Sequence, residues 1–216
     1  MAPPTDSHLL AERARALGAE LTPAAAAQLL AYLDAMLVLN QQLNLTAVRD
    51  REQAVVLHAL DGLAFAGTDL VPHRALDIGS GNGFPGVAIA VLHPRADVVL
   101  MDRTGKKVRA IGACLVQAGL DRVEAMQLDA AQAPGLHKEL RHAFDVATAR
   151  AVGPPEQLAL LAAPLVRPGG HLVLWLDHDA PAPERLDGFR RQRIVDYTLP
   201  EPAPRQRRLG VWQRTR

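Results

Sequence analysis

A glycine-rich turn that directly follows a short apolar segment is the part of this chain best suited to bind a ligand. The segment reads Asp77-Ile78-Gly79-Ser80-Gly81-Asn82-Gly83. Glycines let the backbone approach a ligand closely, and a helix after such a turn presents free N–H groups. The glycines do not follow the G-x-G-x-x-G spacing of dinucleotide sites, and the Gly-Lys-Ser/Thr of a phosphate-binding loop is absent. The turn therefore argues against NAD and ATP as ligands.

The same turn matches the pattern E/D-x-G-x-G-x-G, and on it the chain resembles the class I S-adenosylmethionine (SAM)-dependent methyltransferases. Their ligand is a nucleoside with an amino-acid tail and no phosphate. In that class, a carboxylate at the end of the second strand accepts hydrogen bonds from the ribose hydroxyls, and a segment after the third strand faces the adenine. Asp102 and the segment Leu128–Ala130 stand at these positions. The resemblance implies SAM as the cofactor.

Further blocks, in order along nearly the whole chain, narrow the resemblance to one family. The blocks are Asn44–Asp50, His58–Leu63, Leu76–Gly86, Lys106–Val108 and Ala149–Ala151. The Leu-Thr-Ala of the first block and the Phe-Pro-Gly that ends the glycine-rich block are the most specific. On these residues the chain resembles the bacterial glucose-inhibited-division protein B family, the small-subunit ribosomal RNA (guanine-N7) methyltransferases.

This resemblance implies methyl transfer to N7 of a guanine in 16S ribosomal RNA, with the RNA or the 30S subunit as partner. Guanine N7 carries an in-plane lone pair and is unprotonated at neutral pH, and the sulfonium of SAM is already a strong methyl donor. In-line positioning and exclusion of water then matter more than proton transfer. We therefore expect neither a catalytic triad nor a metal ion.

Arg150 follows the fourth predicted strand and is the expected catalytic residue, because its guanidinium can hold an RNA phosphate or the guanine carbonyl. A salt bridge to a neighbouring carboxylate is the alternative role for Arg150. The expected cofactor-binding residues are Asp77, Gly79, Ser80, Gly81, Asn82, Gly83, Phe84, Asp102, Arg103, Thr104, Asp129, Ala130 and Arg150. The expected RNA-binding residues are Arg49, Lys106, Lys107 and Arg109, with Arg51 beside Arg49 and Arg103 just before Lys106. Solvated surface charge is the competing interpretation for these cations.

Two other polar groups have the residue types of a catalytic or metal site. His58 and Asp61 lie one helical turn apart, and we expect them to hold the N-terminal helices on the sheet rather than to move protons. Asp177-His178-Asp179 has no partner cluster nearby in the sequence, so a polar loop is expected there instead of metal ligands.

The chain departs from the family's pattern at two places. The fifth predicted strand ends in Leu174-Trp175-Leu176-Asp177, where the family has a lysine-glycine pair, and Ala131 replaces a glutamate. A missing cation at the substrate rim leaves two alternatives open. One is a relative that methylates a small heteroaromatic compound, and the other is a binding module without turnover, such as a ribosome-assembly factor.

The elements around these motifs predict an α/β fold. Residues 1–70 read as a helical extension, with helices over Ser7–Leu17, from Thr22-Pro23 to about Asn40, and after Asp50. In residues 71–216, the SAM-binding domain, strands are predicted at Ala75–Ile78, Asp97–Met101, Arg122–Gln127, Phe144–Thr148, His171–Leu176, Arg193–Leu199 and Arg208–Gln213, and helices at Val87–Leu92, Thr104–Ala118 and Glu156–Val166, with a turn at Arg167–Gly170. This alternation predicts a Rossmann-like class I methyltransferase fold, with a mostly parallel seven-stranded sheet, helices on both faces and an N-terminal helical cap.

Composition agrees with a folded protein of one main domain: 216 residues, 49% hydrophobic and 22% charged. No apolar run approaches the ~18–20 residues that span a bilayer. No secretory signal is visible, and the single cysteine, Cys114, allows no intrachain disulfide. A cytoplasmic monomer without a membrane partner is expected. The net charge is +1, yet residues 185–216 carry nine arginines against three carboxylates, which suits either contact with a polyanion or a solvated edge.

Overall fold

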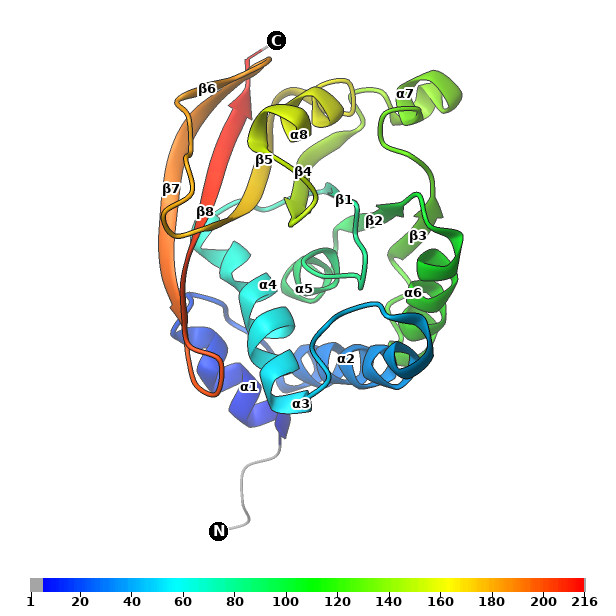
Figure 1. The fold of residues 1–216 in the computed structure, drawn as a ribbon, viewed down its shortest axis with the longest axis vertical. Helices are drawn as coiled ribbons and strands as arrows, with labels where there is room; N and C mark the ends of the chain where they lie inside the picture. Colours follow the sequence, from blue (N-terminus) through cyan, green and yellow to red (C-terminus); the bar gives the residue numbers. More distant parts are fainter. Residues whose placement is uncertain (1–5, 216) are drawn as a thin grey trace.

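The computed structural model describes residues 6–215, in which eight strands form one sheet in the order β3-β2-β1-β4-β5-β8-β7-β6 (Figure 1). The strands are β1 (Arg74–Ile78), β2 (Asp97–Asp102), β3 (Val123–Gln127), β4 (Phe144–Arg150), β5 (Val166–Asp177), β6 (Arg185–Leu186), β7 (Phe189–Leu199) and β8 (Arg205–Arg214). The first five strands in the order are parallel, and β8, β7 and β6 continue the sheet antiparallel. The predicted α/β class and the mostly parallel sheet are confirmed.

The predicted number of seven strands is too low by one. The additional strand, β6, is only two residues long and pairs with the start of β7. A two-residue strand has no alternating pattern that a sequence could display, so it follows only from the return of the chain at Gly188, which has φ of 73°.

The helices cover both faces of the sheet, as the strand–helix alternation predicts. On one face lie α5 (Gly86–Leu92) and α6 (Gly105–Ala118), and on the other α7 (Ala133–Leu136) and α8 (Pro155–Ala162). Two hydrophobic clusters fill these layers, and neighbouring residues of β1 alternate between them: Ala75 packs in the first, Leu76 in the second. Parallel strands buried on both faces read as continuous apolar runs, which is why the sequence reveals them.

Of the two N-terminal helices, the second packs against α5 and α6, and the first packs on the second (Figure 1). They are α1 (Asp6–Arg15) and α2 (Pro23–Leu43). The predicted start of α2 is confirmed, because the Thr22 hydroxyl accepts a hydrogen bond from the Ala25 N–H at 3.1 Å and Pro23 occupies the first turn. The helix runs a few residues past the expected end and stops where Asn44 adopts a left-handed conformation, with φ of 50°.

Helix α2 is long and apolar enough to cross a membrane by length and composition alone, with 21 residues and a mean hydropathy of 1.2. The sequence shows no unbroken apolar run of that length, because polar residues such as Gln28 and Asp34 interrupt the apolar residues of α2. Its buried residues pack against α1, α5 and α6. This packing is that of a core helix.

The helix expected after Asp50 is built from several helical types. It comprises α3 (Arg51–Ala54), a π-helical turn (Val55–Leu60), α4 (Asp61–Leu63) and a 3-10 turn (Ala64–Thr68). A π turn widens the helix locally, and such turns are frequent at functional sites. Here the π turn carries His58 and is followed directly by Asp61.

Two predicted boundaries near the second half of the sheet are wrong. Helix α8 ends at Ala162 rather than Val166, and β5 begins at Val166 and includes the predicted turn Arg167–Gly170. The register between β4 and β5 shifts between Phe144 and Val146, so the extra residues are accommodated as an irregularity in the strand.

The basic C-terminal segment forms the long strands β7 and β8, and several of its arginines are held in ion pairs. Arg207 contacts Asp177 at 2.6 Å, Arg208 contacts Asp196 at 2.9 Å, and Arg193 contacts Asp69 at 2.8 Å. These pairs favour the interpretation of an arginine-rich sheet edge for this segment.

Candidate functional site

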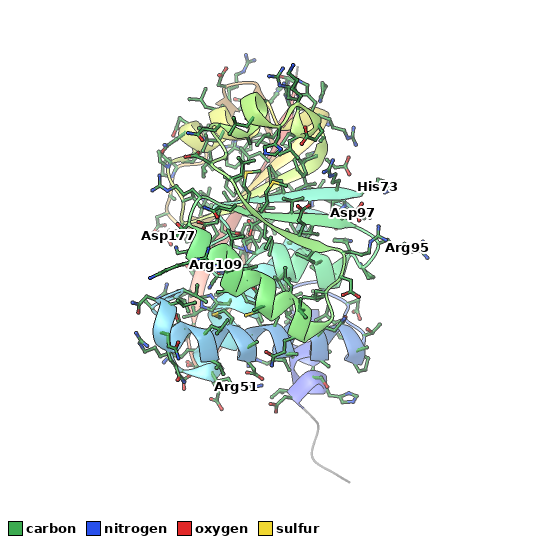
Figure 2. The ribbon with its side chains drawn as sticks, turned by 90° about the vertical axis from the view of Figure 1, so that its right-hand side faces the viewer. Arg51, His73, Arg95, Asp97, Arg109 and Asp177 are labelled. Carbon is green, nitrogen blue, oxygen red and sulfur yellow. The ribbon has the colours of Figure 1, made fainter. Side chains whose placement is uncertain are left out.

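The carboxyl ends of the parallel strands form the edge of the sheet that can hold a ligand. Strands β2 and β3 lie on one side of β1, and β4 and β5 lie on the other. The strand order therefore reverses at β1, which is the switch point where ligands bind in open α/β sheets. His73 and Asp97 stand at the amino ends of β1 and β2, and Asp177 stands at the carboxyl end of β5. Figure 2 shows the first two on the other side of the molecule from Asp177.

A cavity of about 600 Å³ opens at this edge. Its walls include Ile78, Gly79, Met101, Asp102, Arg103, Thr104, Lys107, Leu128, Asp129, Ala130, Val152 and Gln157. Six of the predicted cofactor-binding residues line it: Gly79, Asp102, Arg103, Thr104, Asp129 and Ala130. The other predicted cofactor-binding residues, Asp77, Ser80 to Phe84 and Arg150, are not among its lining residues. The volume is in the range of pockets that hold nucleotide-sized ligands.

Asp102 is buried and oriented by two backbone groups. Its Oδ2 accepts a hydrogen bond from the Gly81 N–H at 3.0 Å, and its Oδ1 accepts one from the Thr104 N–H at 2.8 Å. A carboxylate offers about four acceptor positions, so each oxygen keeps one for a ligand hydroxyl. Asp129 is held similarly, with Oδ1 accepting from the Ala131 N–H at 2.9 Å.

The residues around the turn fit SAM. Gly79 has φ of 66°, and a Cβ there would lie 2.8 Å from the Val152 side chain, so only glycine leaves the backbone bare at the cavity wall. Ser80 is buried, and its hydroxyl has no hydrogen-bond partner among the described residues. An orphaned buried hydroxyl, a fixed carboxylate and the apolar walls at Met101 and Leu128 match a ligand with a polar ribose, an amino-acid tail and a flat base.

Asp77 lies behind the turn and is buried. Its carboxylate accepts hydrogen bonds from the Thr148 hydroxyl at 2.8 Å and from the Gly86 N–H at 3.1 Å. Burial raises the pKa of Asp77 to about 7, and these two bonds oppose the rise only in part. Asp77 therefore ties β1 to β4 and to the start of α5, and it titrates close to neutral pH.

Asp77→Asn is expected to change how stability depends on pH. Folded Asp77 holds a proton up to about pH 7, whereas the unfolded residue loses it near pH 4. The free energy of unfolding of the wild type therefore falls as pH rises from 4 to 7, by at most about 1.4 kcal/mol per unit. In the variant, the asparagine amide can donate to the Thr148 hydroxyl, and that hydroxyl can donate to the Leu76 carbonyl at 3.3 Å. Because asparagine carries no charge, the variant lacks this fall in stability with pH.

Urea denaturation of Asp77→Asn and wild type at pH 4, 6 and 8 checks this expectation. The difference between them should grow with pH in favour of the variant. Asp121→Asn, an exposed residue at the other end of the sheet, serves as the control and should follow the wild type. A constant difference between Asp77→Asn and wild type would contradict a raised pKa.

Tyr32 of α2 connects the N-terminal helices to the turn, a role that the sequence does not reveal. Its hydroxyl donates to the Asn82 carbonyl at 3.0 Å, and its ring meets the Phe84 ring edge-on at 5.6 Å. Gly83 has φ of 90°, and a Cβ there would lie 2.0 Å from the Tyr32 hydroxyl oxygen. The helical extension thus presses directly on the predicted cofactor loop.

Gly83→Ala is expected to lower the free energy of unfolding by about 2–5 kcal/mol, combining left-handed strain with overpacking against the buried Tyr32. Gly112→Ala is the matched control. Gly112 lies in α6 with nothing within 4 Å of a new Cβ, so the same change should stabilise the protein by about 0.8–1 kcal/mol. Thermal or urea denaturation measures both. Equal effects would mean that the turn does not have this geometry.

Arg150 forms a buried ion pair, the alternative role considered for it above. Its Nη1 donates to Asp61 Oδ2 at 2.8 Å and to the Leu57 carbonyl at 3.0 Å, and its Nη2 lies 3.3 Å from His58 Nδ1. The Arg150 side chain is 13% exposed and that of Asp61 is fully buried. Arg150 stands at the end of β4 beside Ala151 and Val152, although it is not among the lining residues of the cavity.

His58 links three segments and is neutral. Burial first, and the charge of Arg150 second, lower the pKa of His58 to about 3. Its Nε2 lies 3.0 Å from the Thr46 hydroxyl, and its ring stacks on Phe84 with centroids 5.8 Å apart. With Asp61 bound to Arg150, the two residues join the helical extension to the sheet, as expected for them.

A family model described as "GidB: rRNA small subunit methyltransferase G" matches residues 25–180. The chain belongs to this family. The ribosomal RNA small subunit methyltransferase G of Leptothrix cholodnii is 35% identical over 98% of this chain and 96% of its own length. That of Chloroflexus aggregans is 36% identical over 76% of this chain and 69% of its own length, and that of Streptococcus gordonii 30% identical over 87% and 83%.

Solved structures share the fold of this GidB chain. A mutant of MtNAS in complex with S-adenosylmethionine aligns with a TM-score of 0.58 and 14% identity, over 85% of this chain and 73% of that one. A SAM-dependent methyltransferase from Aquifex aeolicus aligns with a TM-score of 0.53 and 15% identity, over 74% and 92%. The predicted class I methyltransferase fold is confirmed. The predictions of a SAM-dependent enzyme and of this family are confirmed by the family match, and a small-molecule relative is not favoured.

The predicted RNA-binding cations fall into two groups. Near the cavity, Lys107 lines the wall, and Arg103, Lys106 and Arg109 are exposed, with no ion pair among the described residues. Figure 2 shows Arg109 extending outward from α6.

Arg49 and Arg51 lie elsewhere on the GidB chain. Arg51 is bound by Asp34 at 2.6 Å and Asp6 at 3.1 Å, and the Asp34 hydrogen bond raises its pKa. Arg49 is exposed, donates to Asn44 Oδ1 at 3.4 Å, and with Arg51 lines a separate cavity of about 560 Å³. The structure thus places Lys107 of α6 in the wall of the larger cavity and these two arginines at a separate one.

In the segment Asp177-His178-Asp179, the first residue ends β5 and the other two form a turn. Asp177 binds Arg207, and within residues 6–215 no group of three or more His, Cys, Asp or Glu side chains is arranged to hold a metal ion.

Proposed function

We propose that this chain transfers the methyl group of SAM to N7 of a guanine in 16S ribosomal RNA, acting as a cytoplasmic monomer on RNA within the 30S subunit. The cavity at the carboxyl ends of the parallel strands supports this proposal most strongly. A fixed, buried carboxylate (Asp102), a bare glycine turn (Gly79) and the unpaired cations of α6 meet at one edge of the sheet in a chain of the GidB family.

Each group has a role in this proposal. Asp102 accepts hydrogen bonds from the ribose hydroxyls, and the apolar walls at Met101 and Leu128 enclose the adenine. When bound, SAM supplies an electrophilic methyl group on a sulfonium. Arg103 and Lys107, at the mouth of the cavity, bind RNA phosphates, and Arg150 orients the guanine through its carbonyl or a neighbouring phosphate.

Proton transfer is not required at the methylated atom, because N7 is unprotonated and its lone pair lies in the plane of the base. The buried neutral His58 is then a structural acceptor rather than a general base. The contribution of the protein is alignment of N7 with the methyl group and exclusion of water.

The proposal is tested by offering labelled SAM with 30S subunits, with free guanosine and with a panel of small heteroaromatic bases. We expect label only in the ribosomal RNA. Label in a small base and none in RNA would favour the small-molecule enzyme. Calorimetric binding of SAM without label in any acceptor would favour a binding module, and absence of SAM binding would contradict the cavity assignment.

A further inference from the structure

Asp61 is the most heavily contacted buried charge in the described part of the chain. Its Oδ2 accepts from Arg150 Nη1 at 2.8 Å, and its Oδ1 accepts from the Tyr197 hydroxyl at 2.6 Å. Arg207 Nε lies 3.9 Å from the same Oδ1. The backbone carbonyl of Asp61 accepts from Trp175 Nε1 at 2.8 Å. The two carboxylate oxygens therefore serve different partners, one at the end of β4 and one on β7.

The contacts fix one part of Arg150 and leave another available. Both short bonds, to Asp61 and to the Leu57 carbonyl, use Nη1. Nη2 points toward the neutral His58, which can accept a hydrogen bond. A guanidinium has five N–H donors in a rigid plane, so anchoring one nitrogen sets the direction of the others. The Nε–H of Arg150 has no partner among the described residues and is left for a ligand.

Tyr197 sets the rotation of the Asp61 carboxylate. The Oδ1 atom is fully enclosed, and the Tyr197 hydroxyl is its only hydrogen-bond donor in the described structure. Burial and the neighbouring Asp61 charge raise the pKa of Tyr197 far above its ordinary value, so the phenol keeps its proton. With Oδ1 held by Tyr197 and Oδ2 held by Arg150, the Tyr197 hydroxyl helps to fix the carboxylate plane in which Oδ2 meets Arg150.

We propose that Tyr197 is a positioning residue that acts through Asp61 to hold Arg150 in the orientation needed by the substrate. Strand β7, remote in sequence from every methyltransferase motif, thereby contributes to the reaction. The inference rests on the role proposed for Arg150, because Tyr197 itself reaches neither the cavity nor the turn.

A purely structural role for the Tyr197 hydroxyl makes a different prediction. The helix that carries Asp61 is already held by the Trp175 bond to its carbonyl and by the buried Leu60 and Leu63. Phenylalanine at 197 keeps the ring packing and removes only the donor. A loss of stability alone would leave turnover by the folded fraction unchanged, whereas a misdirected Arg150 lowers it.

The test is a double-mutant cycle measured on 30S methylation. Tyr197→Phe should lower kcat about tenfold, the scale of one lost hydrogen bond to a charged group, with the Kd for SAM unchanged within twofold. In an Asp61→Asn background, Tyr197→Phe should have less than a twofold further effect. Arg208→Gln is the control. It breaks the ion pair between Arg208 of β8 and Asp196 of β7 without touching Asp61, and it should keep full kcat.

A second readout does not depend on turnover. In arginine labelled with ¹⁵N, the two Nη signals of Arg150, assigned with Arg150→Lys, should be resolved in the wild type and merge in Tyr197→Phe. Unchanged Arg150 signals, or additive losses of kcat in the cycle, would overturn the inference. A wild-type protein that methylates no RNA would instead contradict the proposed function, and the spectra would still decide the positioning role.

Discussion

Asp102→Ala is expected to weaken SAM binding by at least about a hundredfold while the protein stays folded. The variant loses two hydrogen bonds from ribose hydroxyls to a carboxylate, each worth about 1.5–3 kcal/mol. It also frees the N–H groups of Gly81 and Thr104, which Asp102 fixes at 3.0 and 2.8 Å. Titration calorimetry with SAM measures the change directly.

Two further variants serve as controls for the loss of SAM affinity in Asp102→Ala. Asp102→Asn keeps one acceptor and the shape of the side chain, so its affinity should fall between those of the wild type and Asp102→Ala. Asp121→Ala removes an exposed carboxylate at the opposite end of the sheet and should bind SAM like the wild type. Unchanged affinity in Asp102→Ala would remove Asp102 from the ribose site.

Arg150→Ala is expected to lower the free energy of unfolding by about 3–5 kcal/mol, in addition to abolishing methylation. The reason is Asp61, which is fully buried and would be left with Arg207 Nε, 3.9 Å from its Oδ1, as its remaining cation. Loss of activity in this variant alone would therefore be ambiguous. Urea denaturation at neutral pH measures the loss of stability.

The double variant Asp61→Asn/Arg150→Ala separates the two effects. Neutralising Asp61 should restore most of the stability, because asparagine still accepts from Tyr197 and carries no charge. Methylation should stay at least a hundredfold below wild type if Arg150 orients the substrate, the scale of a lost positioning group. Normal turnover in the stable double variant would leave Arg150 with a structural role only.

The sequence predicts the cofactor side of the site because that side is local. Residues 77–83 are contiguous, and Asp102 and Asp129 each follow a strand whose apolar run is visible. The carboxyl ends of parallel strands meet at one edge, so order along the chain gives proximity in space.

The sequence does not predict the support of the site because that support comes from distant segments. Tyr32 reaches Asn82 across 50 residues, Tyr197 reaches Asp61 across 136, and Trp175 reaches Asp61 across 114. A lone aromatic residue in a helix or an edge strand looks the same whether its polar end is solvated or bound to a site. The direction of Arg150 is likewise decided by the π turn at Val55–Leu60, which has no pattern of its own.

The departure from the family's pattern at the end of β5 has a structural counterpart. This strand ends at Asp177 without the lysine that the family resemblance implies, and Arg207 of β8 binds Asp177 at 2.6 Å while approaching Asp61. A cation is therefore present at this end of β5, supplied by the neighbouring strand. No contact in the structure explains the replacement of a glutamate by Ala131.

Mapping the transferred methyl group tests the proposed methylation of guanine N7 in 16S ribosomal RNA. Purified protein, tritium-labelled SAM and 30S subunits from a strain lacking this gene are incubated, and the RNA is digested and analysed by mass spectrometry. We expect label in a single 7-methylguanosine of 16S RNA with the wild-type protein. This label should be lost with Asp102→Ala. Label at another atom or in another RNA, or SAM bound without any label in 16S RNA, would contradict it.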